Sequence, residues 1–148
     1  MNVSLLKLIS MLSGFIGIIC GLLALLPFID GFILFILMCL PAIIVITTLM
    51  KINLLKIESV SESITIGAIT GFVSFMAFAL VYMPIVIILM RTMKYYTNEG
   101  VALTLVHANL FILIVLSVFI AILSATINAF CGFLVYYITE IFKNMNNR

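Results

Sequence analysis

The sequence predicts an all-α, polytopic integral membrane protein, folded as a four-helix transmembrane bundle. Of its 148 residues, 66% are hydrophobic and only 8% are charged, whereas about a quarter of the residues in soluble domains are charged. Four long apolar blocks contain no Asp, Glu, Lys or Arg, namely residues 8–26, 31–50, 64–90 and 101–139. In a helix, about 20 such residues cross the hydrocarbon core of a bilayer, which is roughly 30 Å thick. We therefore expect a single transmembrane domain over residues 1–148.

The first two expected helices, residues 8–26 and 31–50, form a hairpin. Pro27 and Gly31 interrupt the apolar pattern between them, and Asp30 is a favourable N-cap for the second helix. A charged residue is costly inside the hydrocarbon region, so we expect this turn to lie at the membrane surface.

The third expected helix covers residues 60–90. It follows a short connection that ends in Ser59-Val60-Ser61-Glu62. This segment matches the capping box, in which a serine hydroxyl accepts a hydrogen bond from the first turn of a helix. Pro84 lies inside the expected helix and should bend it, because proline removes one backbone donor and its ring crowds the preceding turn.

The fourth expected helix covers residues 101–142 and is longer than one span requires. A helix of this length would measure on the order of 60 Å. We expect one span with an interfacial first section, because Glu99, His107 and Asn109 make its start polar. The alternative is a re-entrant or fifth segment that turns at residues 124–128. That stretch contains neither Gly nor Pro, which favours the single span.

The distribution of basic residues predicts the orientation. With four spans both termini share a side, and that side carries five basic residues, namely Lys7, Lys51, Lys56, Lys143 and Arg148. The opposite side carries Arg91 and Lys94. Lys and Arg are enriched in cytoplasmic loops, so we expect both termini in the cytoplasm and the protein in the cell (inner) membrane.

Small residues recur every three or four positions along three of the four expected helices. Gly17-x-x-x-Gly21 and Gly67-x-x-x-Gly71 fit the motif that lets membrane helices approach closely. We expect the first, third and fourth helices to form the tight core, with the second helix facing lipid. The same stripes would also serve association with a second copy or with a larger membrane complex. The residues expected at helix contacts are Gly14, Gly17, Gly21, Gly67, Gly71, Ser74, Ser124 and Gly132.

Asn128 is the only strongly polar side chain deep in the predicted hydrocarbon region. Buried polar residues in membranes either hydrogen-bond to a neighbouring helix or line a pathway. We expect an interhelical hydrogen bond. The alternative places Asn128 on a solute path together with Ser124 and Thr70.

Several kinds of chemistry are not supported by the sequence. Cys20, Cys39 and Cys131 are isolated, without a CxxC pair or a Cys/His cluster, so neither metal binding nor disulfide exchange is expected. No phosphate-binding glycine loop or nucleophile–base arrangement is present, so we expect neither a catalytic residue nor a cofactor. The net charge of +2 is too small to suggest nucleic-acid binding.

These observations predict a small non-enzymatic membrane protein that acts through helix–helix contacts, as an accessory or structural subunit. Its expected partners are the lipid bilayer and either itself or a larger membrane complex. The alternative function is an oligomeric channel or facilitator for a small solute.

Overall fold

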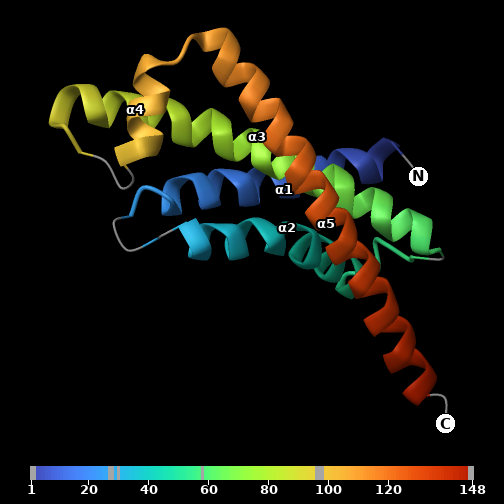
Figure 1. The fold of residues 1–148 in the computed structure, drawn as a ribbon. Helices are drawn as coiled ribbons and strands as arrows, with labels where there is room; N and C mark the ends of the chain where they lie inside the picture. The colour runs from blue at the N-terminus through green and yellow to red at the C-terminus, as the bar shows by residue number, and fades with distance from the viewer. Residues whose placement is uncertain (1–2, 27–28, 30, 58, 96–98, 147–148) are drawn as a thin grey trace.

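The computed structural model of the chain describes residues 3–26, 29, 31–57, 59–95 and 99–146. Within these residues the chain is helical, in agreement with the predicted all-α class (Figure 1). The helices are α1 (Val3–Leu23), α2 (Gly31–Lys51), α3 (Val60–Met93), α4 (Glu99–His107) and α5 (Leu110–Asn146). In this part of the chain four helices, all but α4, are long and apolar enough to cross a membrane. This is consistent with the expected membrane location.

Helix α3 lies at the centre of the bundle. It contacts each of the other helices, most extensively α5 and then α1. Figure 1 shows α1 and α3 running in one direction and α2 and α5 in the other. Helix α5 crosses its neighbours steeply, and its C-terminal part projects beyond them.

The ends of α3 follow its sequence closely. The serine half of the predicted capping box is confirmed, because the Ser59 hydroxyl accepts a hydrogen bond of 3.3 Å from the backbone N–H of Glu62. The helix continues through Pro84 and ends at Met93, followed by Lys94 in the left-handed conformation. Asp30, the expected N-cap of α2, lies outside the described residues.

The helix expected over residues 101–142 is divided in the structure. A break at Ala108 and Asn109 separates the short α4 from the long α5. The Asn109 side chain accepts a hydrogen bond of 3.2 Å from the N–H of Phe111, and its carbonyl oxygen accepts the N–H of Leu113 at 3.0 Å. Asn109 therefore caps a new helix. The alternative turn at residues 124–128 is not formed, because these residues lie inside α5.

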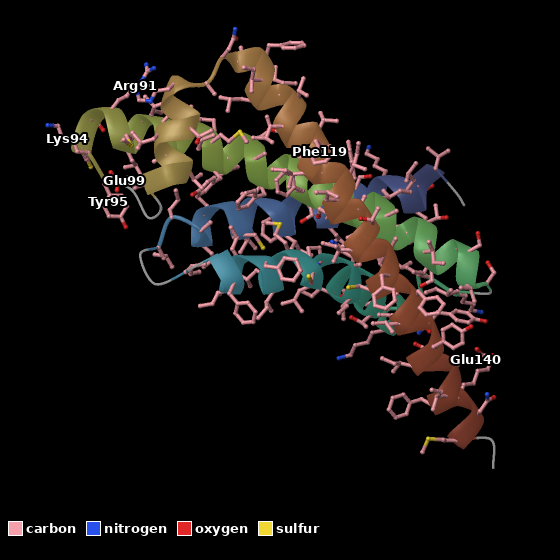
Figure 2. The ribbon with its side chains drawn as sticks, viewed as in Figure 1. Arg91, Lys94, Tyr95, Glu99, Phe119 and Glu140 are labelled. Atoms are coloured by element: carbon pink, nitrogen blue, oxygen red, sulfur yellow. The ribbon has the colours of Figure 1, made fainter. Side chains whose placement is uncertain are left out.

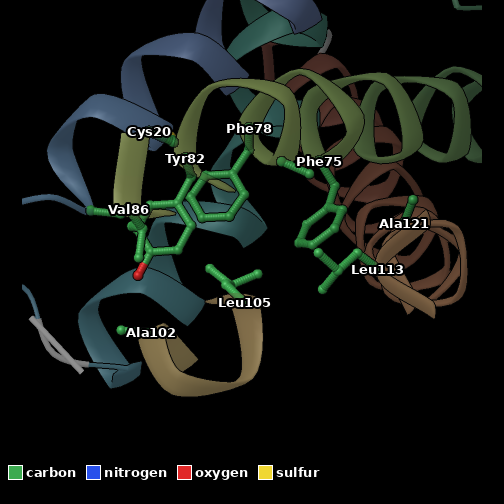
Figure 3. Packing of buried hydrophobic residues seen from close by; sticks show 11 residues of the cluster. Cys20, Phe75, Phe78, Tyr82, Val86, Ala102, Leu105, Leu113 and Ala121 are labelled. Carbon is green, nitrogen blue, oxygen red and sulfur yellow. The ribbon is translucent and has the colours of Figure 1, made fainter. Parts of the chain in front are cut away.

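Two apolar clusters fill the bundle. One surrounds the second half of α3, where the Phe78 and Tyr82 rings stack with centroids 5.1 Å apart (Figure 3). Helix α4 closes this cluster with Ala102 and Leu105. The other cluster lies nearer the chain's N-terminus and contains Ile9, Val45, Ile46, Leu49, Leu55, Ile66 and Val135.

Helix α2 is less exposed than expected. Its first half does present large apolar side chains such as Phe32 and Phe35 on the surface. Its second half, from Pro41 to Leu49, packs into the bundle. The prediction that this helix faces lipid is therefore corrected for its second half, where Pro41, Ala42, Val45, Ile46 and Leu49 are buried in the bundle.

The surface of the bundle is rich in large apolar side chains, including Phe119 on α5 (Figure 2). In water such a surface would favour aggregation. In a bilayer, lipid tails would cover it at no cost.

Candidate functional site

Glycines bring the backbones of α3 and α5 into close contact. A Cβ atom added at Gly67 would overlap the carbonyl oxygen of Asn128. One added at Gly71 would lie 2.5 Å from the carbonyl oxygen of Ser124 and 2.6 Å from Cβ of Asn128. Backbone atoms cannot move aside as a flexible side chain would. Only glycine therefore fits at these two positions without separating the helices.

Serine hydroxyls tie the same crossing together. Ser63 donates a hydrogen bond of 2.7 Å to the carbonyl oxygen of Gly132, and Ser124 donates one of 3.1 Å to the carbonyl oxygen of Gly71. A Cβ atom at Gly132 would overlap the carbonyl oxygen of Ser63. Each helix therefore supplies both a glycine and a hydroxyl to the other. Without water, such bonds satisfy polar groups that would otherwise be costly to bury.

Asn128 connects this crossing to a third helix. Its side chain is fully buried, and its Nδ2 donates hydrogen bonds of 2.9 Å to the carbonyl oxygens of Met38 and Ser124. Its Oδ1 accepts a hydrogen bond of 3.0 Å from the backbone N–H of Ala42. One amide thus joins α5 to the backbone of α2 in both directions.

The two α2 groups bound by Asn128 are normally partners of each other. In a regular helix the N–H of Ala42 donates to the carbonyl oxygen of Met38, four residues earlier. Pro41 disturbs this turn, since it lacks an N–H and its ring crowds the carbonyl of Leu37. A side chain inserted into the backbone ladder is a recognised cause of a helix kink. The Asn128 amide is placed as such an insert.

Sequence reasoning identified Asn128 but missed Pro41 as its counterpart. The available signal was one proline and one asparagine, each near the middle of an otherwise apolar helix. A proline disturbs the backbone hydrogen bonds of its turn, and an amide has both a donor and an acceptor to offer there. The sequence alone does not reveal that the two meet.

Helices α1 and α3 pack through a second glycine contact. A Cβ atom at Gly17 would overlap the carbonyl oxygen of Ser74, and one at Gly21 would lie 3.2 Å from that of Phe78. Gly14 differs, because a Cβ atom there would have no neighbour within 4 Å among the described residues. The structure therefore does not place Gly14 at a close helix contact, although it shares the sequence spacing of the other glycines.

Two hydroxyls on α3 are buried without a hydrogen-bond partner in the described part of the chain. They are Oγ1 of Thr70 and Oγ of Ser74, and both residues are fully buried. Ser13, also fully buried, bonds instead within its own helix, where its hydroxyl donates to the carbonyl oxygen of Ile9 at 2.6 Å. Buried unpaired hydroxyls destabilise a fold and therefore call for a reason.

An apolar groove of about 290 Å³ borders the crossing on its α2 side. Met38, Cys39, Phe75 and Ile127 contribute to its walls, with Ser124 at its edge. Among the residues that the structure describes, no group of three or more His, Cys, Asp or Glu side chains is placed to hold a metal ion. The arrangement is suited to holding helices together.

The predicted contact residues thus fall into two crossings. Gly17, Gly21 and Ser74 lie between α1 and α3, and Gly67, Gly71, Ser124 and Gly132 lie between α3 and α5. Asn128 extends the second crossing to α2. Comparisons of the chain with protein-family models, with curated proteins and with solved structures find no match.

Proposed function

We propose that the protein is a small, non-enzymatic integral membrane protein that acts through helix–helix contacts, as an accessory or structural subunit. The observation that carries the proposal is the set of hydrogen bonds made by the Asn128 amide. Both ends of its amide are engaged by backbone groups of α2 and α5. These bonds support a packing role for the most polar side chain of the predicted hydrocarbon region.

The contact with a partner is assigned to α5. This helix has 37 residues and extends beyond the other helices (Figure 1). Its outer face exposes Phe119 and Ile122, opposite the side that packs on α3. A helix face that continues past the bundle reaches a neighbouring protein more readily than one flanked by other helices.

Site-specific photo-crosslinking in native membranes tests this proposal. A crosslinker at Phe119 on α5 should capture a membrane protein, which mass spectrometry of the purified adduct identifies as a second copy or another subunit. The matched control is Phe15, an equally apolar and exposed position on α1. Capture of lipid alone at both positions would contradict the proposal.

We further propose that the protein resides in the cell (inner) membrane with both termini in the cytoplasm. The support is the excess of Lys and Arg on the side of the termini. Single cysteines at positions 7, 56 and 143 should react with a membrane-impermeant reagent from the cytoplasmic side, and a cysteine at position 94 from the other. Cys20, Cys39 and Cys131 are first replaced. Labelling of positions 56 and 143 from opposite sides would refute four spans.

A second candidate function is an oligomeric channel or facilitator for a small solute. It is favoured by the buried, unpaired hydroxyls of Thr70 and Ser74, since polar groups without a protein partner are typical of pathways. Liposomes that contain only this protein distinguish the two functions. They should stay tight if the protein acts through contacts, and they should leak a small solute if it is a facilitator.

A further inference from the structure

A groove of about 680 Å³, lined by both charged and apolar residues, lies where α5 leaves the bundle. Asn53 and Lys56 line it from the connection between α2 and α3, and Tyr136, Glu140 and Lys143 line it from the last turns of α5. Figure 2 shows Glu140 on this projecting part of α5. None of these residues takes part in the helix crossings described above.

The groove lies at the ends of the apolar helices. Helix α2 ends at Lys51, and α5 acquires its first charges at Glu140 and Lys143. In a bilayer, this is the level at which hydrocarbon gives way to head groups. In a bilayer the groove would therefore face the phosphates of the surrounding lipids.

The backbone fixes the groove's α2 side. Asn53 adopts the left-handed conformation, with φ of 56°. Its N–H donates to the carbonyl oxygen of Met50 at 3.0 Å, and the N–H of Leu54 donates to that of Leu49 at 3.0 Å. These two bonds form a Schellman cap, which ends the helix in a defined turn. Beyond this turn Leu55 is buried, which anchors the segment that carries Lys56.

We propose that this groove binds the head group of an anionic phospholipid. The ammonium groups of Lys56 and Lys143 would hold the phosphate, and Asn53 and Tyr136 would donate hydrogen bonds to its neighbouring oxygens. Basic pockets between membrane helices are typical sites for anionic lipid head groups. This inference goes beyond the proposed function, because it requires a bilayer but no protein partner.

The charge of the groove indicates the kind of head group. Among the described residues that line it, two lysines and one glutamate leave a net charge of one positive unit. This balance matches a phosphodiester with a single negative charge, as in phosphatidylglycerol. A head group with several phosphates would be repelled by Glu140.

The apolar wall indicates a lipid as the source of the phosphate. Met50, Leu55 and Ile57 line the groove beside the lysines. Free phosphate is strongly hydrated and gains nothing from such a wall. The acyl chain of a lipid would cover it and add the free energy of apolar burial.

The test uses the full-length protein purified in a mild detergent. Thermal unfolding is followed while phosphatidylglycerol, phosphatidylcholine or inorganic phosphate is added, and native mass spectrometry counts the lipids retained. A ligand that binds only the folded state raises the unfolding temperature. We expect phosphatidylglycerol to raise it and to be retained, in a salt-dependent manner. Phosphatidylcholine and inorganic phosphate should do neither at the same concentration.

Single substitutions locate the site. Lys56→Ala and Lys143→Ala should each weaken phosphatidylglycerol binding about fivefold, which corresponds to about 1 kcal/mol for one lysine near an anionic surface. Lys7→Ala, an exposed lysine of α1 outside the groove, is the matched control and should leave binding unchanged. Glu140→Gln should tighten binding, because it removes a negative charge beside the phosphate.

Four outcomes would overturn the proposal. An equal loss in Lys7→Ala would indicate general surface charge, and equal binding of phosphatidylcholine would show that the anion is not recognised. Saturation by inorganic phosphate would identify a soluble ligand. Weaker binding in Glu140→Gln would indicate a head group that carries an ammonium.

Discussion

Helices α3 and α5 pack in two different ways along their shared length. At one end, Gly67 and Gly71 bring the backbones into direct contact. At the other, Leu80, Met83 and Ile114 line an apolar groove of about 430 Å³ between the same two helices. The small residues permit close approach, and the large ones hold the helices apart.

This contrast shows how specificity arises among apolar helices. Lipid tails solvate Leu and Ile as well as a protein does, so large apolar side chains give one helix little preference for another. Close backbone contact and hydrogen bonds between buried groups are different, because lipid replaces neither. We therefore expect the tight end to determine the fold and the open end to tolerate change.

The largest effect should follow from adding a single methyl group at the tight end. Gly67→Ala should destabilise the protein by about 1–3 kcal/mol, as other overpacked contacts do. The new Cβ would meet the backbone of Asn128, which cannot yield as a side chain does. Unfolding in mixed detergents, followed by circular dichroism, measures this change in the free energy of unfolding.

Gly14→Ala is the matched control on α1. It has open space around it, and alanine favours the helix over glycine by up to about 1 kcal/mol. Its stability should therefore equal or exceed that of the wild type. If both substitutions had the same effect, helix propensity rather than contact would govern these glycines.

Removing the hydrogen bonds that connect the tight end to α2 should have an intermediate effect on stability. Asn128→Leu should cost about 1–2 kcal/mol, because it leaves the N–H of Ala42 and the carbonyl oxygen of Met38 without the amide. In a Pro41→Ala background the turn can close and these two groups can bond to each other. The same substitution should then cost less, with a coupling energy of about 0.5–2 kcal/mol.

A second proline provides the control for this double-mutant cycle. Pro84 lies inside α3, and Asn128 bonds to the turn that contains Pro41 instead. Asn128→Leu should therefore cost the same with and without Pro84→Ala. An equal cost in all three backgrounds would show that the effect of Asn128 does not depend on the turn at Pro41.

The fold class could be predicted from the sequence, because a helix that crosses a bilayer needs a long run of residues without charge. The start of α3 was likewise predictable, since the capping box at Ser59 is a local interaction. The break at Asn109 was not predicted, because asparagine in an apolar run is equally compatible with a polar surface residue and with a cap. In the structure, the hydrogen bond from the N–H of Phe111 to the Asn109 side chain shows that Asn109 is a cap.

The detailed contacts were less predictable for a geometric reason. Gly14 and Gly17 belong to the same small-residue stripe, yet only Gly17 meets α3. Two helices that cross touch over a limited length, and the crossing point depends on the whole bundle. The meeting of Asn128 with the turn at Pro41 joins residues distant in sequence, so it depends on the same global packing.

The smallest effect distinguishes serines at the two ends of the α3–α5 pair. Ser63 bonds across the crossing to Gly132 at 2.7 Å, whereas Ser117, at the open end, bonds to Leu113 of its own helix at 2.6 Å. Ser63→Ala should cost about 0.6 kcal/mol, the average for hydrogen bonds between membrane helices. Ser117→Ala should cost less, because the hydrogen bond from Ser117 to α3 is a weak one, to the sulfur of Met83 at 3.6 Å. A larger loss from Ser117→Ala, in the same unfolding measurement, would mean that the open end also determines how α3 and α5 pair.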